Sequence, residues 1–548
     1  MKEINKETLI DAFESAANFL VHKKEEVNEL NVFPVPDGDT GTNMSMTVKS
    51  AIKQMKEGNP KTAGDVAMLA SRGALMGARG NSGVILSQLF RGFSESVKDL
   101  EIIDVQALAL ALKKASEMTY LAVMKPTEGT ILTVGREAAD YGLRIAKKHK
   151  EIIPFAKEVL EAANKSLENT PNLLPVLKEA GVVDAGGKGL CVILEGAILA
   201  LEGKKFEEAD ASEPTAKKNL VQKRESISTD TIAFGYCTEF IVTTEKNGVE
   251  ALKEKLTPLG DSLLVVGDDK MIKVHVHTND PGKALQFGLE HGFLKDIKID
   301  NMRLQHEEIL FTEEQVESTQ KEEISSEDPM KKYGFVAVSS GEGIEELFKN
   351  LGVDYVVTGG QTMNPSTEDL LEGVRKTNAE NVFILPNNSN IIMAANAAKV
   401  IAECNVMVIE SKSIPQGVSA CLVFNEELDP EENFETMVEA IGEIKTAQVT
   451  YAVRDTDMNG VKIHKDDFIG ISGKDILFSS KELKETTLET IKKLIDEDTS
   501  LLTIYSGMDT KEEEVEELME EVEELYDDID VEIVVGKQPI YFYLLSAE

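Results

Sequence analysis

Apolar residues recur at helical spacing along the first two hundred residues of the chain. Leu9 and Leu20 fall on one face of a helix, and Leu108 and Ala115 do so in a later segment. About eight such segments follow one another, separated by breaks that are rich in glycine and proline. The pattern predicts a helical barrel or bundle over residues 1–202, with polar connections gathered at one end.

The hydrophobic period changes after residues 203–229, a charged stretch that contains few large apolar residues and predicts a linker. Residues 230–310 then carry the pattern of a strand, a helix, two strands around a "GDDK" turn, a helix opened by proline, and a final strand. That order, βαββαβ, predicts a ferredoxin-like α+β middle domain.

A second linker, acidic in composition, is predicted at residues 311–332. Beyond it, short apolar strands alternate with helical segments over residues 333–548. This alternation predicts an α/β domain with a mostly parallel sheet, built either as one lobe or as two sub-lobes joined near residues 426–446.

Composition and charge narrow the function classes. The formal net charge of −39 disfavours nucleic acid and anionic lipid as bulk partners. No apolar run approaches the roughly 20 residues of a membrane span, and the polar N-terminus lacks the pattern of a signal peptide. The four cysteines are far apart and form no CxxC pair. We therefore expect a cytoplasmic protein without a transmembrane segment or a disulfide framework.

The stretch "NVFPVPDGDTGTNM" is the most unusual connection in the helical region. Asp37 and Asp39 flank a glycine, which permits the sharp turn that would aim both carboxylates at one centre. Hard oxygen ligands of this kind suit Mg²⁺, and the helix start predicted at "TGTNM" would offer free N–H groups to an anion. The alternative is a Pro-Asp-Gly turn that only caps a helix.

Three further glycine-rich connections strengthen the metal-site hypothesis. "GARGNSG" carries Gly80, Asn81 and Ser82 before a helix, "KPTEGT" carries Thr130, and "VVDAGGKGL" carries Asp184. Glycines let a phosphate approach the backbone, and hydroxyl groups add donors. No GxxxxGK[ST] motif occurs, so the loops predict a nucleotide–metal site other than a P-loop.

These four motifs, in this order and spacing, resemble the nucleotide-binding domain of dihydroxyacetone kinases and, more closely, the ATP-binding subunit of bacterial fatty acid kinase. The resemblance covers essentially the whole chain and is looser in the C-terminal region. It implies an eight-helix barrel that binds ATP through two Mg²⁺ ions, a middle domain, and a C-terminal domain similar to the fatty-acid-binding partner. Dihydroxyacetone kinases carry a third aspartate a few residues upstream of the pair, where this chain has Asn31.

The resemblance also implies roles for particular residues. Asp37 and Asp39 would be catalytic Mg²⁺ ligands, and the neutral side chain of Asn31 would coordinate one of the two ions. The residues expected to contact ATP are Thr40, Thr42, Asn43, Gly80, Asn81, Ser82, Thr130 and Asp184.

The implied reaction is transfer of the γ-phosphate of ATP to a fatty acid that a separate fatty-acid-binding protein presents. The product would be an acyl phosphate for phospholipid synthesis. Two alternatives stay open: a dihydroxyacetone-type kinase subunit, and a non-catalytic nucleotide-sensing scaffold.

The middle domain carries a second candidate metal site. His275 and His277 are two residues apart in a predicted strand and therefore share a face, and Cys237 lies in another strand. If the strands are neighbours, a thiolate and two imidazoles could bind Zn²⁺. The alternative is a half-buried strand with two surface histidines and a core cysteine.

In the C-terminal region, Ser339, Ser340 and Thr362 fall at predicted strand ends, where ligands of α/β sheets tend to bind. The domain could be a lipid binder. We favour a degenerate relative of the partner fold that serves dimerisation or partner docking, and we expect a homodimer.

Overall fold

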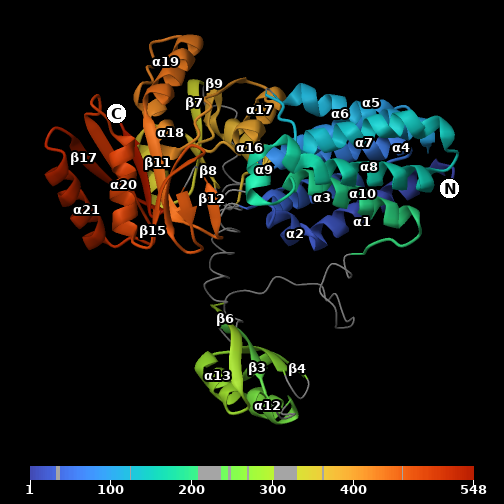
Figure 1. The fold of residues 1–548 in the computed structure, drawn as a ribbon, viewed down its shortest axis with the longest axis horizontal. Coiled ribbons are helices and arrows are strands. Elements are labelled where there is room, and N and C mark those ends of the chain that lie inside the picture. Colours follow the sequence, from blue (N-terminus) through green and yellow to red (C-terminus); the bar gives the residue numbers. More distant parts are fainter. Residues whose placement is uncertain are drawn as a thin grey trace. The chain divides into compact units, whose positions relative to one another are not determined.

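The computed structural model divides into two compact units, Met1–Thr215 together with Pro329–Glu548, and Ala216–Asp328. Figure 1 shows the elements of each unit. The structure describes residues 1–31, 38–123, 125–207, 236–244, 249–267, 271–301, 330–360, 363–458 and 461–548.

Long helices make up most of the described residues up to 207 (Figure 1). They are α1 (Lys6–His22), α3 (Thr40–Glu57), α4 (Ala63–Met76), α5 (Gly80–Val97), α6 (Val105–Ala122), α7 (Ile131–Ile145), α8 (Ile152–Leu173) and α10 (Ala185–Leu201). Each helix in this series packs on the next, and α10 packs back on α1, which closes a ring. A closed ring is what the predicted eight-helix barrel requires. Two short helices, α2 (Lys24–Asn28) and α9 (Pro175–Ala180), and a two-stranded pair, β1 (Glu3–Ile4) with β2 (Ile103–Asp104), complete this region.

The apolar faces predicted from the sequence form the core of the ring. Leu9, Leu20, Leu108 and Ala115 are all buried, which confirms the helical period of these segments. Burial of such stripes supplies most of the stability of the helices, because isolated helices of this length are marginal in water. Among the described helices of the chain, none combines the length and apolar character needed to cross a bilayer.

The unit Ala216–Asp328 has the element order predicted for the middle domain. The elements are β3 (Tyr236–Thr243), α12 (Val249–Leu256), β4 (Gly260–Gly267), β5 (Met271–Thr278), α13 (Pro281–Leu289) and β6 (Phe293–Asn301). The strands form one antiparallel sheet in the order β4-β5-β3-β6, and Phe240, Leu252 and Val274 lie in the core between sheet and helices. The βαββαβ order is thus observed, and the arrangement agrees with a ferredoxin-like domain.

The C-terminal region begins with a four-stranded sheet in the order β10-β9-β7-β8, in which every pairing is parallel. Its strands are β7 (Lys331–Ser339), β8 (Tyr355–Thr358), β9 (Ala379–Leu385) and β10 (Asn405–Val408). Three helices alternate with these strands: α15 (Glu342–Asn350), α16 (Thr367–Thr377) and α17 (Ile392–Ile401). Two more helices follow the sheet in the chain, α18 (Ile414–Leu422) and α19 (Pro430–Glu443). This half confirms the predicted parallel α/β pattern.

The second half contains a six-stranded sheet in the order β15-β14-β11-β18-β16-β17. Its strands are β11 (Lys445–Tyr451), β14 (Phe468–Ser472), β15 (Asp475–Ser480), β16 (Leu501–Gly507), β17 (Asp530–Gln538) and β18 (Tyr543–Ala547). Helices α20 (Leu483–Leu494) and α21 (Glu512–Leu525) and a hairpin of β12 (Thr456–Met458) and β13 (Val461–Ile463) accompany it.

The expectation of a mostly parallel sheet is wrong for this second half. Only β16 and β17 pair in parallel, and the other pairings of the sheet are antiparallel. The connection between β14 and β15 is a tight turn in which Gly473 has φ +59°. A turn this short can only join antiparallel strands, because a parallel pair needs a long crossover. The two sheets share one hydrophobic cluster, in which Phe335 and Phe383 of the first sheet are joined by Tyr505 and Leu544 of the second, and α19 lies between the sheets in the chain.

Candidate functional site

A cavity of about 480 Å³ opens where the helices α3, α5, α7 and α10 begin. Most residues predicted to form the nucleotide site line it: Asn31, Asp39, Thr40, Asn43, Asn81, Ser82, Thr130 and Asp184. These residues come from connections that are far apart in the sequence. The helical scaffold therefore brings the four glycine-rich motifs to one place, as the sequence predicted. Asp37 lies outside the described residues.

Asp39 stands at the start of α3 but does not cap it. The carboxamide oxygen of Asn28, on α2, accepts hydrogen bonds from the backbone N–H groups of Gly41 at 2.8 Å and Thr42 at 3.2 Å. Because Asn28 satisfies these first amides of the helix, the Asp39 carboxylate forms no capping bond and faces the cavity. The capping alternative for this motif therefore does not describe Asp39.

Burial sets the acid–base character of Asp39. Loss of solvation raises the pKa of its carboxyl to about 6, although hydrogen bonds from Asn43 and Asn364 oppose the rise. Beside it, the Thr40 hydroxyl donates to the carboxamide oxygen of Asn31 at 2.9 Å. Carboxylate, hydroxyl and carboxamide oxygens thus lie together, and they are a donor set that suits Mg²⁺.

The second loop begins α5 with a residue that must be glycine. Gly80 has φ +57°, and a Cβ at this position would lie 2.5 Å from the side-chain nitrogen of Asn43. Both facts exclude a larger residue without rearrangement. Gly80 itself is not among the described lining residues, whereas Asn81 and Ser82, directly behind it, line the cavity.

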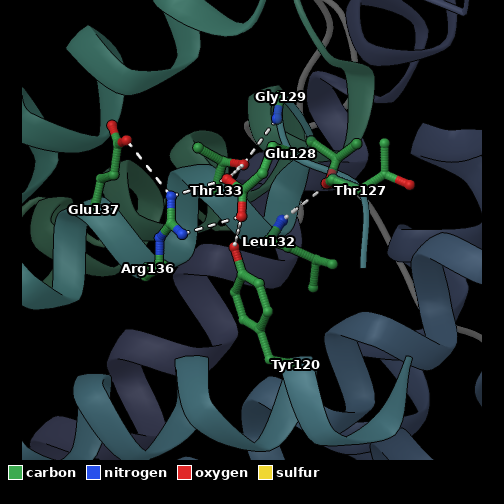
Figure 2. Close-up of polar contacts among 9 residues, drawn as sticks. Tyr120, Thr127, Glu128, Gly129, Leu132, Thr133, Arg136 and Glu137 are labelled. Carbon is green, nitrogen blue, oxygen red and sulfur yellow. Dashed lines mark hydrogen bonds and ion pairs between the residues drawn. The ribbon is translucent and has the colours of Figure 1, made fainter. Parts of the chain in front are cut away.

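The third loop is held by a polar cluster around Glu128 (Figure 2). The Glu128 carboxylate accepts hydrogen bonds from Thr133 at 2.7 Å, from Tyr120 at 3.1 Å and from both terminal nitrogens of Arg136 at 3.0 and 2.8 Å. Thr130 caps α7 and donates its hydroxyl hydrogen to the Thr127 carbonyl at 2.7 Å. The cluster fixes the loop so that Thr130 stays at the cavity wall.

The fourth loop presents Asp184 as the N-cap of α10. Its carboxylate accepts the Gly187 N–H at 2.7 Å, and its own N–H donates to the Thr170 hydroxyl at 3.1 Å. Burial raises the pKa of the Asp184 carboxyl to about 6, although hydrogen bonds from the backbone of Gly187 and Ile131 oppose the rise. Asp184 thus caps α10 and lines the cavity. Its contact with a nucleotide stays a prediction.

One predicted nucleotide contact, that of Thr42, is not brought to the cavity by the described geometry. Thr42 is not among the lining residues, and its hydroxyl accepts a hydrogen bond from the side-chain nitrogen of Asn28 at 3.2 Å. Its predicted contact with phosphate is untested. In the C-terminal region, Ser339 is buried at the end of β7 and Thr362 lies outside the described residues, so lipid binding there also stays a prediction.

The backbone register of the middle domain partly agrees with the zinc hypothesis. Cys237 on β3 pairs with His277 on β5, and His275 is two residues further along the same strand. The side chains of the three residues lie outside what the structure describes. Among the described residues, no group of three His, Cys, Asp or Glu side chains could hold a metal ion. Zinc is therefore not supported here, and metal analysis of the purified chain is the measurement that tests it.

Sequence reasoning missed several residues of the cavity wall, and three of them bear on its chemistry or on its contact with the C-terminal region. Lys125 is the only cationic residue among the described lining residues, and Asn390 and Met393 come from the C-terminal region. Lys125 stands in the "KPTEGT" break, where its position beside a predicted site could have identified it. Nothing local in the sequence around Asn390 or Met393 indicates a contact with residues some three hundred positions earlier.

Comparison with protein families gives three successive matches along the chain. Residues 34–199 match the DAK2 domain, residues 233–309 match the FakA-like middle domain of fatty acid kinase, and residues 334–548 match the FakA-like C-terminal domain. Two relatives are similar to the whole chain. Protein YloV of Bacillus subtilis (strain 168) is 42% identical over 558 residues, and an uncharacterized protein of Staphylococcus aureus (strain USA300) is 40% identical over 556 residues. Both alignments cover 100% of each chain.

Solved structures show weaker similarity. The Streptococcus pneumoniae fatty acid kinase B3 protein loaded with linoleic acid is 12% identical, with a TM-score of 0.28, over 40% of this chain and 99% of that one. The dihydroxyacetone kinase of C. freundii in complex with AMP-PNP and Mg²⁺ is 19% identical, with a TM-score of 0.28, over 35% of this chain and 33% of that one. Likenesses of this strength carry no argument about this chain.

Proposed function

Because the chain belongs to the FakA-like family of fatty acid kinase proteins, we propose that it transfers the γ-phosphate of ATP to a fatty acid. The acceptor is presented by a separate fatty-acid-binding protein, and the product is an acyl phosphate. The observation that carries the proposal is the shared cavity, in which Asp39, Asn81, Thr130 and the start of α10 meet. We place the reaction in the cytoplasm, as the composition predicts.

The cavity fits a magnesium-bound nucleotide in size and chemistry. Its volume of about 480 Å³ lies within the usual range of small-molecule sites. Asp39 and, by the resemblance, Asp37 would hold the metal, with Asn31 and Thr40 offering neutral oxygens. When bound, Mg²⁺ neutralises charge on the transferring phosphoryl group.

The residues of the chain have three tasks in this reaction. Asn81 and Ser82, at the first turn of α5, donate hydrogen bonds to phosphate oxygens and thereby align the phosphates. Thr130, fixed by the Glu128 cluster, closes the opposite wall. No general base is needed, because a fatty acid carboxylate is already ionised at neutral pH. The chain must instead reduce the repulsion between the carboxylate and the γ-phosphate.

Lys125 is suited to that last task. It is exposed, lines the cavity, and forms no ion pair with any carboxylate in the described part of the chain. We expect Lys125→Ala to lower kcat/KM for Mg·ATP about tenfold to a hundredfold, since a charge-assisted contact with phosphate would be lost. Steady-state kinetics measure the effect.

Lys113→Ala, which removes a lysine paired with Asp140, is the control and should leave the rate unchanged. Equal rates for both variants would remove Lys125 from the mechanism.

The experiment that tests the function is ATP turnover by the purified chain with oleate, with and without a candidate fatty-acid-binding partner. Acyl phosphate is expected only when the partner is present. Robust phosphorylation of dihydroxyacetone would instead indicate a dihydroxyacetone-type kinase. ATP binding without turnover of any acceptor would indicate a nucleotide-sensing scaffold.

A further inference from the structure

The C-terminal region packs on the face of the helical region that carries the nucleotide cavity, within the same compact unit. Arg79 donates a hydrogen bond to the Asn364 carbonyl at 2.7 Å and forms an ion pair with Asp369 at 3.3 Å. The Thr367 N–H donates to the Ala78 carbonyl at 3.2 Å. The contact therefore includes backbone, charge and hydrogen-bonding groups, all at the start of α5.

Apolar packing continues across the same contact. Ala78, just before α5, and Val84, near its start, are buried in one cluster with Val336, Leu371 and Ala395 of the parallel sheet and its helices. Helix α17 lies against α5. The start of α5 in the helical region therefore packs against the parallel sheet of the C-terminal domain and against α17.

Two asparagines of the C-terminal domain form hydrogen bonds with residues that line the cavity. The side-chain nitrogen of Asn364 donates to a carboxylate oxygen of Asp39. The side-chain oxygen of Asn390 accepts a hydrogen bond from the side-chain nitrogen of Asn81 at 3.2 Å. Asn364 is 1% exposed, so its contact with Asp39 is buried.

The polarity of both contacts matches that of the ligands assigned above. An amide N–H directed at Asp39 presents positive charge where Mg²⁺ would bind. A carbonyl oxygen directed at Asn81 presents negative charge where a phosphate oxygen would bind. We propose that the C-terminal domain is a displaceable cap on the nucleotide site, in which Asn364 substitutes for the cation and Asn390 substitutes for the phosphate.

This inference rests on the proposed function, and it adds a competition between cap and substrate. A cation and an N–H donor cannot use the same lone pair of Asp39, and the positive end of the amide repels the cation. Binding of Mg·ATP therefore competes with these two contacts, and the cap lowers the apparent affinity by the fraction of chains that are closed.

The first test is Asn364→Ala in the full-length chain. The variant loses a hydrogen bond to a charged group in the closed state only, so we expect it to bind Mg·AMP-PNP about tenfold more tightly than wild type. Titration calorimetry measures the dissociation constants. The control is Asn405→Ala, which changes an exposed asparagine on β10 of the same domain and should leave the affinity unchanged.

Equal or weaker binding by Asn364→Ala, with normal binding by wild type, overturns the cap and leaves the proposed function in place. If neither wild type nor the variant binds Mg·AMP-PNP, the proposed function itself fails. The two failures are therefore distinguishable.

A second test uses the wild-type chain and does not depend on the folding of a variant. Thr367 is the first residue of α16, so its N–H has no partner within the helix and is protected by the Ala78 carbonyl across the contact. Saturating Mg·AMP-PNP should speed hydrogen exchange in the peptide that contains Thr367. Unchanged or slower exchange in this peptide would contradict the cap.

Discussion

Asp39→Ala is expected to lower the rate of phosphoryl transfer by about a thousandfold, with the helical region still folded. The variant removes the one described carboxylate that faces the cavity without capping a helix, because Asn28 takes the capping role at α3. Its removal relieves the cost of burying a charge, and the hydrogen bond that it accepts from Asn364 lies at the contact with the C-terminal region, so the helical region itself should stay folded. The rate is measured as acyl phosphate formed with the partner present, and circular dichroism reports the fold.

Two further variants make this result specific. Asp39→Asn keeps the shape of the side chain and removes its charge, so it should be impaired about as strongly as Asp39→Ala. Asp99→Ala removes an exposed carboxylate from the same helical region and should leave the rate unchanged. Near-normal turnover by Asp39→Asn would show that Asp39 is not a metal ligand.

The second large effect is expected for Gly41→Ala, which should destabilise the helical region by about 2–3 kcal/mol. A Cβ at Gly41 would lie 2.2 Å from the Lys24 carbonyl oxygen and 3.0 Å from the Asn28 side-chain oxygen. Since the first of these is a backbone atom, α2 as a whole must move away from α3. That movement also withdraws Asn28 from the amides that it caps. Nucleotide binding should fall with stability, because both depend on the start of α3.

Denaturant unfolding followed by circular dichroism measures this change. Gly442→Ala is the matched control, because Gly442 lies in α19 and a Cβ there would meet no atom within 4 Å. In that helix alanine is favoured over glycine, so the control should be neutral or slightly stabilising. Equal stabilities of Gly41→Ala and wild type would mean that α2 and α3 do not approach as closely as the structure shows.

Much of the candidate site could be predicted because its signals are local. The glycine-rich breaks between helical segments identify helix starts, and Asp39, Asn81, Thr130 and Asp184 follow from their positions at those starts. A helix start depends on a few neighbouring residues, which a single sequence displays. Thr42 shows the limit of this reasoning, since its orientation toward Asn28 depends on how α2 packs against α3.

The features that were not predicted depend on long-range contacts. Asn364 forms a hydrogen bond with Asp39, more than three hundred positions earlier in the chain, and no hydrophobic period or sequence motif indicates such a pairing. The second C-terminal sheet was misjudged for a related reason. Its short strands resemble those of a parallel sheet, but β18 pairs antiparallel with β16 and with β11, which lies far earlier in the chain.

The order of the two units along the chain has a consequence for synthesis. The unit Ala216–Asp328 interrupts the other unit, so the ribosome completes the helical region well before the C-terminal region exists. Ala78 and Val84 must therefore remain exposed on the nascent chain until residues near Val336 and Ala395 have been made. During that interval the nucleotide cavity would be open, and a cellular nucleotide could act as a ligand that stabilises the half-finished protein.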